Sequence, residues 1–147
     1  MLKHYLKQIL LAFFAMLMIV STTGVGRLKL ISFKELPRAA RLYINQNYPT
    51  GEVENVGTEG VMLARTFKVR MKDGTSLEFD ADGEWLEVSS EDGEVSSDVV
   101  PCPILYQLRA AYPQSRICKI HRAWKGYDLM LAGGKVVCFN KDYDPIG

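Results

Sequence analysis

The chain is poor in the motifs on which enzyme chemistry usually depends. Its 147 residues include two histidines, and they contain no nucleophile elbow, zinc-binding helix, phosphate-binding loop or Cys-x-x-Cys pair. One histidine lies in the N-terminal segment, and the other, His121, stands alone near a strand end, where such a residue is more often a surface group than a catalytic one. We therefore expect neither an enzyme nor a bound cofactor.

Charge of one sign is not in excess either. Lys and Arg together number 18, Asp and Glu number 17, and no basic tract occurs. Because binding to a nucleic-acid backbone needs clustered positive charge, nucleic acid is not expected as a partner.

Cysteine is scarce and odd in number. Cys102, Cys118 and Cys138 are the only three. In an exported protein an odd count leaves at least one free thiol or an intermolecular bond, so we do not expect a disulfide framework. Cys102 could lie in the first turn of a helix, where the helix dipole lowers the pKa of a thiol. The favoured alternative is that Cys102 is a small apolar residue between two prolines.

No apolar run is long enough to span a membrane comfortably, since a spanning helix needs about 18 apolar residues. The longest run extends from Ile9 to Val20, after Lys3 and Lys7 and before a small polar stretch. This order is typical of a secretory signal peptide, which we predict at 1–24, and it indicates a periplasmic or secreted protein. The alternative is an uncleaved anchor, because an A-x-A site is lacking; membrane contact is expected only in that case.

What the sequence does contain is one pattern that occurs twice. Leu36-Pro37 and Tyr48-Pro49 are matched 64 residues later by Val100-Pro101 and Tyr112-Pro113. In each copy the first proline suits the start of a helix, and the second ends it. A tandem duplication means that one structural unit was built twice.

Short strands are predicted after each helix. Phe67, Val69 and Met71 alternate with basic residues, and Asp73-Gly74 is a hairpin signal. The predicted fold class is α+β, with two tandem repeats of a helix plus an antiparallel meander and with the helices packed on one face of the sheet. The predicted organisation is repeat one (25–88), a linker (89–99) and repeat two (100–147).

The segment Asp80-Ala81-Asp82-Gly83-Glu84 has a faint likeness to a calcium-binding loop. EF-hand loops need further ligands at fixed spacing and flanking helices, whereas strands are predicted here. A β-turn is the better explanation, and no metal site is expected.

Three segments together resemble a known family. They are Leu36-Pro37 with Tyr48-Pro49, then 69–74 (VRMKDG), then 77–85 (LEFDADGEW). Their order is similar to that of the PepSY-like, β-lactamase-inhibitor-like periplasmic domains of Gram-negative bacteria. The resemblance implies tandem αβ units that form a curved sheet in an exported protein. The namesake inhibitors bind an enzyme with the open face of such a sheet, and PepSY domains proper are thought to restrain peptidases.

The sheet face away from the helices differs between the two copies. In the first copy it carries Lys68, Arg70 and Glu78, which can form pairs across strands. In the second copy the face is more apolar, and an exposed apolar patch often marks a contact surface. Trp124 could anchor a partner there, whereas the alternative is that the patch packs against the first copy or the linker. The predicted partner-binding residues are Trp124, Asp128, Met130, Val136 and Cys138.

The sequence therefore favours an exported, non-catalytic binding module with a protein or peptide partner in the cell envelope, such as an inhibitor-like or protein-interaction domain. Two alternatives stay open. One is a thiol- or metal-dependent envelope enzyme, which would need a nucleophile and a base in one pocket. The other is a structural envelope protein that self-associates through the sheet edge left by a truncated final strand.

Overall fold

The computed structural model describes residues 27–91 and 93–147. The signal peptide predicted for 1–24 lies outside these residues. Within the described part, no helix is long and apolar enough to cross a membrane.

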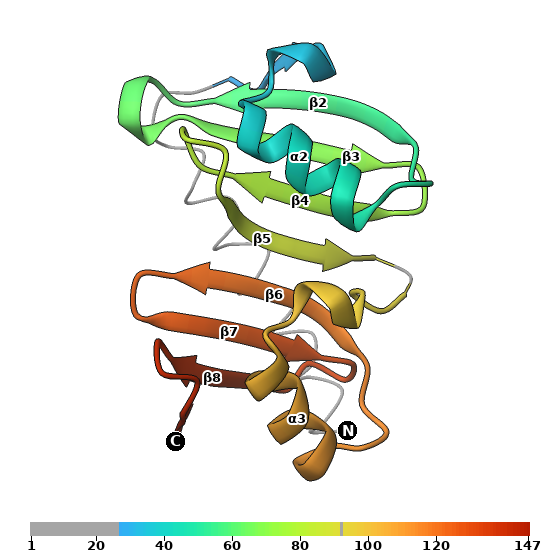
Figure 1. The fold of residues 1–147 in the computed structure, drawn as a ribbon, viewed down its shortest axis with the longest axis vertical. Coiled ribbons are helices and arrows are strands. Elements are labelled where there is room, and N and C mark those ends of the chain that lie inside the picture. Colours follow the sequence, from blue (N-terminus) through green and yellow to red (C-terminus); the bar gives the residue numbers. More distant parts are fainter. Residues whose placement is uncertain (1–26, 92) are drawn as a thin grey trace, which may run out of the picture.

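One antiparallel sheet forms the body of the molecule, and its nine strands lie side by side in chain order (Figure 1). Alternation of apolar and polar residues drives this arrangement, since successive side chains of a strand point to opposite faces. The strands are β1 (Lys29–Ile31), β2 (Val53–Glu59), β3 (Thr66–Met71), β4 (Thr75–Phe79), β5 (Trp85–Ser90), β6 (Ile117–Ala123), β7 (Gly126–Leu131), β8 (Val136–Asn140) and β9 (Pro145–Ile146).

Two short helices cover one face of the sheet, α2 (Arg38–Asn47) and α3 (Cys102–Ala111). Pro37 and Pro101 stand directly before them, as the sequence predicts. Three 3₁₀ turns complete the elements of the described residues: η1 (Phe33–Glu35), η2 (Met62–Ala64) and η3 (Ser97–Val99). Each helix buries a stripe of side chains against the sheet, which is the usual way to complete a core over one sheet face.

The core lies between the helices and the sheet as one cluster. Ala40 and Ile44 of α2 and Ile104 and Leu108 of α3 are buried in it. Every second residue of β3 is buried as well, as the alternation predicts. The opposite face of the sheet carries no helix of the described residues, so we call it the open face.

The predicted fold class is wrong. Instead of two helix-plus-meander repeats, the described residues form a single nine-stranded antiparallel sheet with only two short helices. The pairing of β5 with β6 makes the sheet continuous, with Val88 opposite Ile120. The physical reason is that two separate sheets would leave two more strand edges with unpaired backbone groups, and this pairing removes both.

The turn at Asp80 is held by its own side chain. The Asp80 carboxylate oxygen Oδ1 accepts hydrogen bonds from the backbone N–H groups of Asp82 and Glu84, both at 2.9 Å. Asn140 does the same for Asp142 and Asp144 in the turn between β8 and β9. The acidic segment thus has the local geometry of a side-chain-capped turn, which is the explanation that the sequence favours.

Candidate functional site

Two rows of side chains cross the open face of the sheet. Residues that are directly paired between neighbouring strands share a face, so the strand register places each row. The first row runs through all nine strands: Leu30, Gly57, Lys68, Glu78, Glu87, His121, Asp128, Cys138 and Ile146. The second row runs from β2 to β8: Asn55, Arg70, Ser76, Ser89, Lys119, Met130 and Val136.

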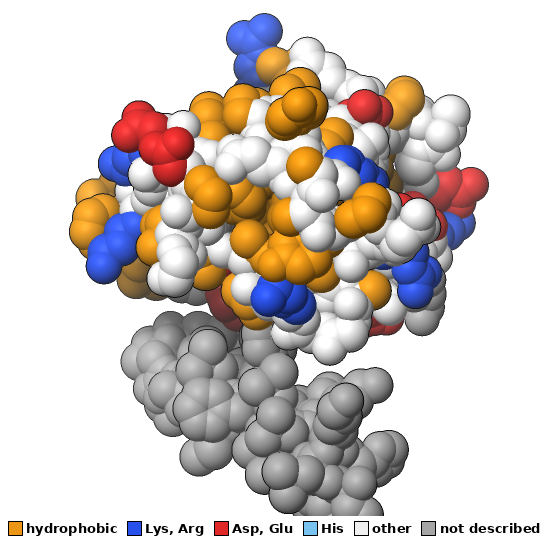
Figure 2. Space-filling view, turned by 90° about the horizontal axis from the view of Figure 1, so that it is seen from below, with side chains coloured by type: hydrophobic (Ala, Val, Ile, Leu, Met, Phe, Trp, Pro, Cys, Tyr) orange, Lys and Arg blue, Asp and Glu red, His pale blue; other side chains and the backbone are white. Residues whose placement is uncertain are grey.

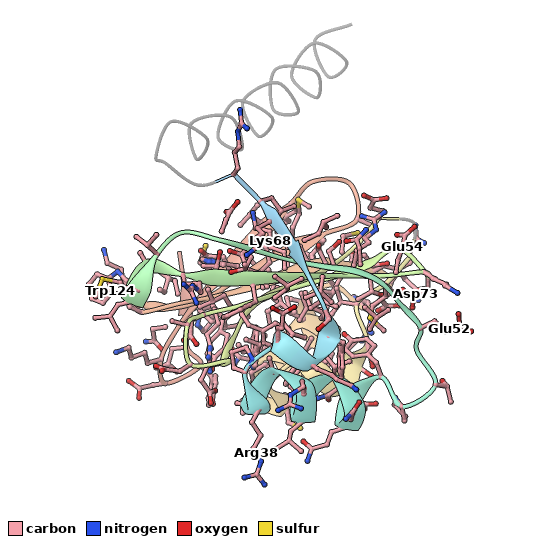
Figure 3. The ribbon with its side chains drawn as sticks, turned by 90° about the horizontal axis from the view of Figure 1, so that it is seen from above. Arg38, Glu52, Glu54, Lys68, Asp73 and Trp124 are labelled. Carbon is pink, nitrogen blue, oxygen red and sulfur yellow. The ribbon has the colours of Figure 1, made fainter. Side chains whose placement is uncertain are left out.

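The part of the open face that β3 to β6 form is dominated by ion pairs. Lys68 points away from α2 in the view along the long axis (Figure 3), and its Nζ lies 2.9 Å from Glu59 Oε1. Lys119 Nζ lies 2.9 Å from Glu87 Oε1, and both side chains are largely buried, with 15% and 23% exposed. Such partly buried pairs fix the side chains in place more firmly than exposed pairs do.

Glu78 is a carboxyl of this charged region whose pKa is raised. Burial raises the pKa of its carboxyl, Lys68 acts against this, and the negative charges of Glu87 and Glu59 raise it further. Glu78 is paired directly with Glu87 across β4 and β5, and like charges in that position repel each other. Because burial first and this repulsion second raise the pKa of Glu78, its ionisation makes the stability of the sheet depend on pH.

Four of the five predicted partner-binding residues lie together on the open face. Asp128 of β7 is paired with Cys138 of β8, and Met130 is paired with Val136. Val136 is 54% exposed, Asp128 is exposed, and Met130 and Cys138 are partly buried. We call these four residues the β7–β8 face.

Trp124, the fifth predicted residue, is not part of the β7–β8 face. It lies at the turn between β6 and β7, beyond the end of the strands (Figure 3), and it is 77% exposed. There it lines an open pocket of about 430 Å³ with Arg122, Tyr127 and Lys141, among others. Tyr127 belongs to a row of aromatic rings on the helix side, where its ring centroid lies 6.3 Å from that of Trp85 and 5.7 Å from that of Tyr143.

Cys138, on the β7–β8 face, has an acidic neighbour in Asp128. A hydrogen bond with Asp128 raises the pKa of the Cys138 thiol, and burial and the Asp128 charge act in the same direction. His121 lies on the other side of Asp128, with Nδ1 3.9 Å from the carboxylate. A cysteine nucleophile needs the opposite shift, because the thiolate is the reactive form.

The comparisons with known proteins agree with this architecture. A family model described as "Putative beta-lactamase-inhibitor-like, PepSY-like" matches residues 65–144, which is more than half of the chain. The chain belongs to the PepSY-like family. The resemblance seen in the sequence is confirmed at this level, whereas a tandem repeat is not confirmed. No curated protein matches the chain.

Three solved structures are similar to this PepSY-like protein. Two are from Bacteroides vulgatus. One, of the DUF2874 family, is 28% identical, and the match covers 82% of this chain and 94% of that chain with a TM-score of 0.76. The other is 29% identical, and the match covers 83% of this chain and 97% of that chain with a TM-score of 0.76. The third, from Bacteroides thetaiotaomicron and described as a candidate calcium-regulated protein, is 26% identical (82%, 94%, TM-score 0.77). All three are named as candidate periplasmic proteins, and the predicted periplasmic or secreted localisation is confirmed.

Sequence reasoning missed one exposed group of this PepSY-like protein. The loop between β2 and β3 presents Val61, Met62 and Leu63 to solvent, with 66%, 82% and 93% of each residue exposed. Met62 also has a positive φ of 52°, in the left-handed region that favours glycine. The signal was present in the sequence as an apolar triplet directly after Gly60, between two predicted strands.

Proposed function

We propose that this PepSY-like protein is a periplasmic binding module without a reaction of its own, and that it holds a protein or peptide partner against the β7–β8 face. The observation that carries the proposal is the paired placement of Met130 and Val136 on a sheet face that no described helix covers. An exposed apolar patch that borders charged residues is the usual composition of a contact surface.

The distribution of charge along the open face also supports this role. From β3 to β6 both rows carry ion pairs, and from β7 outward they become largely uncharged. Burial of apolar side chains such as Met130 and Val136 would contribute roughly 1.5–3 kcal/mol each if they were fully desolvated. The neighbouring fixed charges would then select the partner and its orientation, since charge complementarity governs specificity more than affinity.

An inhibitor-like role is the specific form that the family suggests. The matched family is described as inhibitor-like, and a sheet face is broad enough to cover the active site of another protein.

The thiol-enzyme alternative is not favoured by the chemistry of the site. Cys138 is held by Asp128 in a way that raises the pKa of the thiol, so the reactive thiolate is disfavoured at neutral pH. His121 is separated from Cys138 by Asp128 in the first row, and it therefore does not stand next to the thiol as a base must.

Self-association is the second candidate, and one observation favours it. The final strand β9 pairs only with Cys138 and Phe139, so β9 covers only part of the outer edge of β8. Figure 2, which shows this end of the molecule, has hydrophobic side chains gathered across it with charged ones mostly at its border. A second copy could extend the sheet here by strand addition.

The test is photo-crosslinking in the periplasm with a photoreactive amino acid placed at Val136. The control position is Tyr106, which is 79% exposed on α3 and lies on the other side of the sheet. The proposal expects a discrete adduct from position 136, none from position 106, and loss of the adduct in Met130→Arg. An adduct with the mass of two copies of the chain would favour self-association. Equal adducts from both positions, or none, would contradict the proposal.

A further inference from the structure

The two rows of the open face, together with the ion-pair partners of their residues, carry more negative than positive charge. The cations are Lys68, Arg70 and Lys119, and the carboxylates, twice as many, are Glu54, Glu59, Glu78, Glu87, Glu91 and Asp128. His121 is charged only when it is protonated. Because the whole chain is nearly balanced, with 18 basic and 17 acidic residues, this excess shows that acidic residues are concentrated on the open face.

Each cation of this set is already engaged by a carboxylate of the same set. Lys68 and Lys119 have the ion pairs described above. Arg70 is shared, since its Nη2 lies 2.7 Å from Glu91 Oε2 and its Nε lies 3.8 Å from Glu54 Oε2. Figure 3 shows Glu54 with Lys68 on the side of the sheet away from α2. The cations of the open face are therefore committed to carboxylates of this protein.

Two carboxylates of the set have no ion pair with Lys or Arg among the described residues, and they are Glu78 and Asp128. Glu78 is half-buried in the middle of the first row. Asp128 is accessible, with 51% of its side chain exposed, and its nearest titratable base is His121 at 3.9 Å. An exposed negative charge thus lies on the same face as Met130 and Val136.

We propose that the β7–β8 face binds a protein segment that presents Lys or Arg next to apolar side chains. The apolar side chains of the segment cover Met130 and Val136, and its cation pairs with Asp128. Charge complementarity across an interface determines which partners are accepted and speeds their association. The negative field of the neighbouring open face attracts such a segment from a longer range, and an acidic segment is repelled.

This inference rests on the proposed function, since it names the kind of partner that the β7–β8 face accepts. A partner with a neutral or acidic contact surface would agree with the proposed function and contradict the inference. The experiments therefore vary charge and contact separately.

The first test measures binding of three synthetic peptides to the exported protein by fluorescence anisotropy. The peptides share one apolar sequence and differ only at two positions, which are Lys, Gln or Glu. The Lys peptide should bind roughly five- to tenfold more tightly than the Gln peptide at low salt. This difference should decrease at roughly 0.2 M salt, because exposed charges are then screened. The Glu peptide should bind most weakly. Equal binding of the Lys and Gln peptides would overturn the inference.

The second test uses Asp128→Asn, which keeps the shape of the side chain and removes its charge. It should weaken binding of the Lys peptide roughly two- to fivefold and leave binding of the Gln peptide unchanged. The matched control is Asp98→Asn. Asp98 is an exposed carboxylate of η3, in the segment that leads into α3 on the helix side (Figure 1), and among the described residues it has no ion pair. Equal losses in the two variants would contradict a contact at Asp128.

The third test compares Asp128→Lys with Asp98→Lys in the periplasm, with the photoreactive amino acid at position 136. The inference expects that only Asp128→Lys loses the adduct, while the melting temperatures of the two variants stay close to each other. An adduct that persists in Asp128→Lys would overturn the inference and leave the proposed function intact. No adduct from the otherwise unchanged protein would overturn both. If Asp128→Lys does not fold, Asp128→Asn takes its place in the same comparison.

Discussion

The variant Met130→Arg tests whether Met130 belongs to a contact surface or to the core. Met130 lies in the second row directly opposite Lys119 of β6, and that row already carries Arg70 on β3. A new arginine would face the Lys119 ammonium group, which is itself paired with Glu87. Like charges in directly paired positions destabilise a sheet by roughly 0.2–1 kcal/mol. The fold should therefore survive the change with a small decrease in melting temperature.

The effect of Met130→Arg on partner binding should be larger than its effect on folding. If the partner buries Met130, loss of that contact removes roughly 1.5–3 kcal/mol, which corresponds to binding weaker by roughly ten- to a hundredfold. The assay compares the adduct yield at position 136 with the thermal melting curve of the same variant.

Ser89→Arg is the matched control for Met130→Arg. Ser89 is paired with Lys119 from the other side, on β5, so the new arginine meets the same positive charge but lies outside the β7–β8 face. It should reduce stability to a similar extent and leave the adduct intact. If Met130→Arg unfolds the protein, the position belongs to the core. If both variants lose the adduct equally, the contact is not confined to the β7–β8 face.

Three further outcomes are expected. Gly126→Ala should destabilise the fold by at least about 3 kcal/mol in denaturant unfolding, because a Cβ there would lie 1.9 Å from the Phe139 carbonyl oxygen. Gly133→Ala is the control, since a Cβ there would meet open space, and it should destabilise the fold by about 1 kcal/mol. Glu78→Gln should raise the melting temperature at neutral pH but not at a pH below 4.5, the ordinary pKa of the carboxyl. Because the pKa of Glu78 is raised, the folded wild type binds this proton more tightly than the unfolded chain does. The stability of the wild type therefore decreases as the pH rises from 4.5 through the raised pKa. Intact mass of the exported protein should show that residues 1–24 are absent, and a product in the membrane fraction that retains Met1 would contradict this.

Local patterns predicted the elements of this fold better than their assembly. Pro37 and Pro101 mark the starts of both helices, and the alternation of Phe67, Val69 and Met71 identifies β3, because these signals depend on sterics and burial within a few residues. The pairing of Val88 with Ile120 joins segments on either side of a predicted linker. No local signal specifies such a pairing, and the arrangement into two repeats was wrong for that reason.

The sequence likewise predicted the positions of some residues of the candidate site and not of others. Alternation along β7 and β8 placed Asp128, Met130, Val136 and Cys138 on one face, because neighbouring strands of a hairpin have a simple register. Trp124 could not be placed, since the direction of a turn residue depends on backbone angles that the sequence does not display. The repulsion between Glu78 and Glu87 was likewise hidden, because it arises from the register of β4 against β5.

The sequential order of the nine strands has a consequence for how the protein forms after export. Each strand pairs with the strand before it in the chain, so a strand that leaves the translocation channel finds its neighbour already outside. Contacts between segments close in sequence also form faster than distant ones. The sheet can therefore grow strand by strand from β1 as the chain emerges, and only β2 and β6 must wait for a helix, α2 or α3, to emerge before they pair. Folding in step with secretion would keep the apolar strands from waiting unpaired in the periplasm.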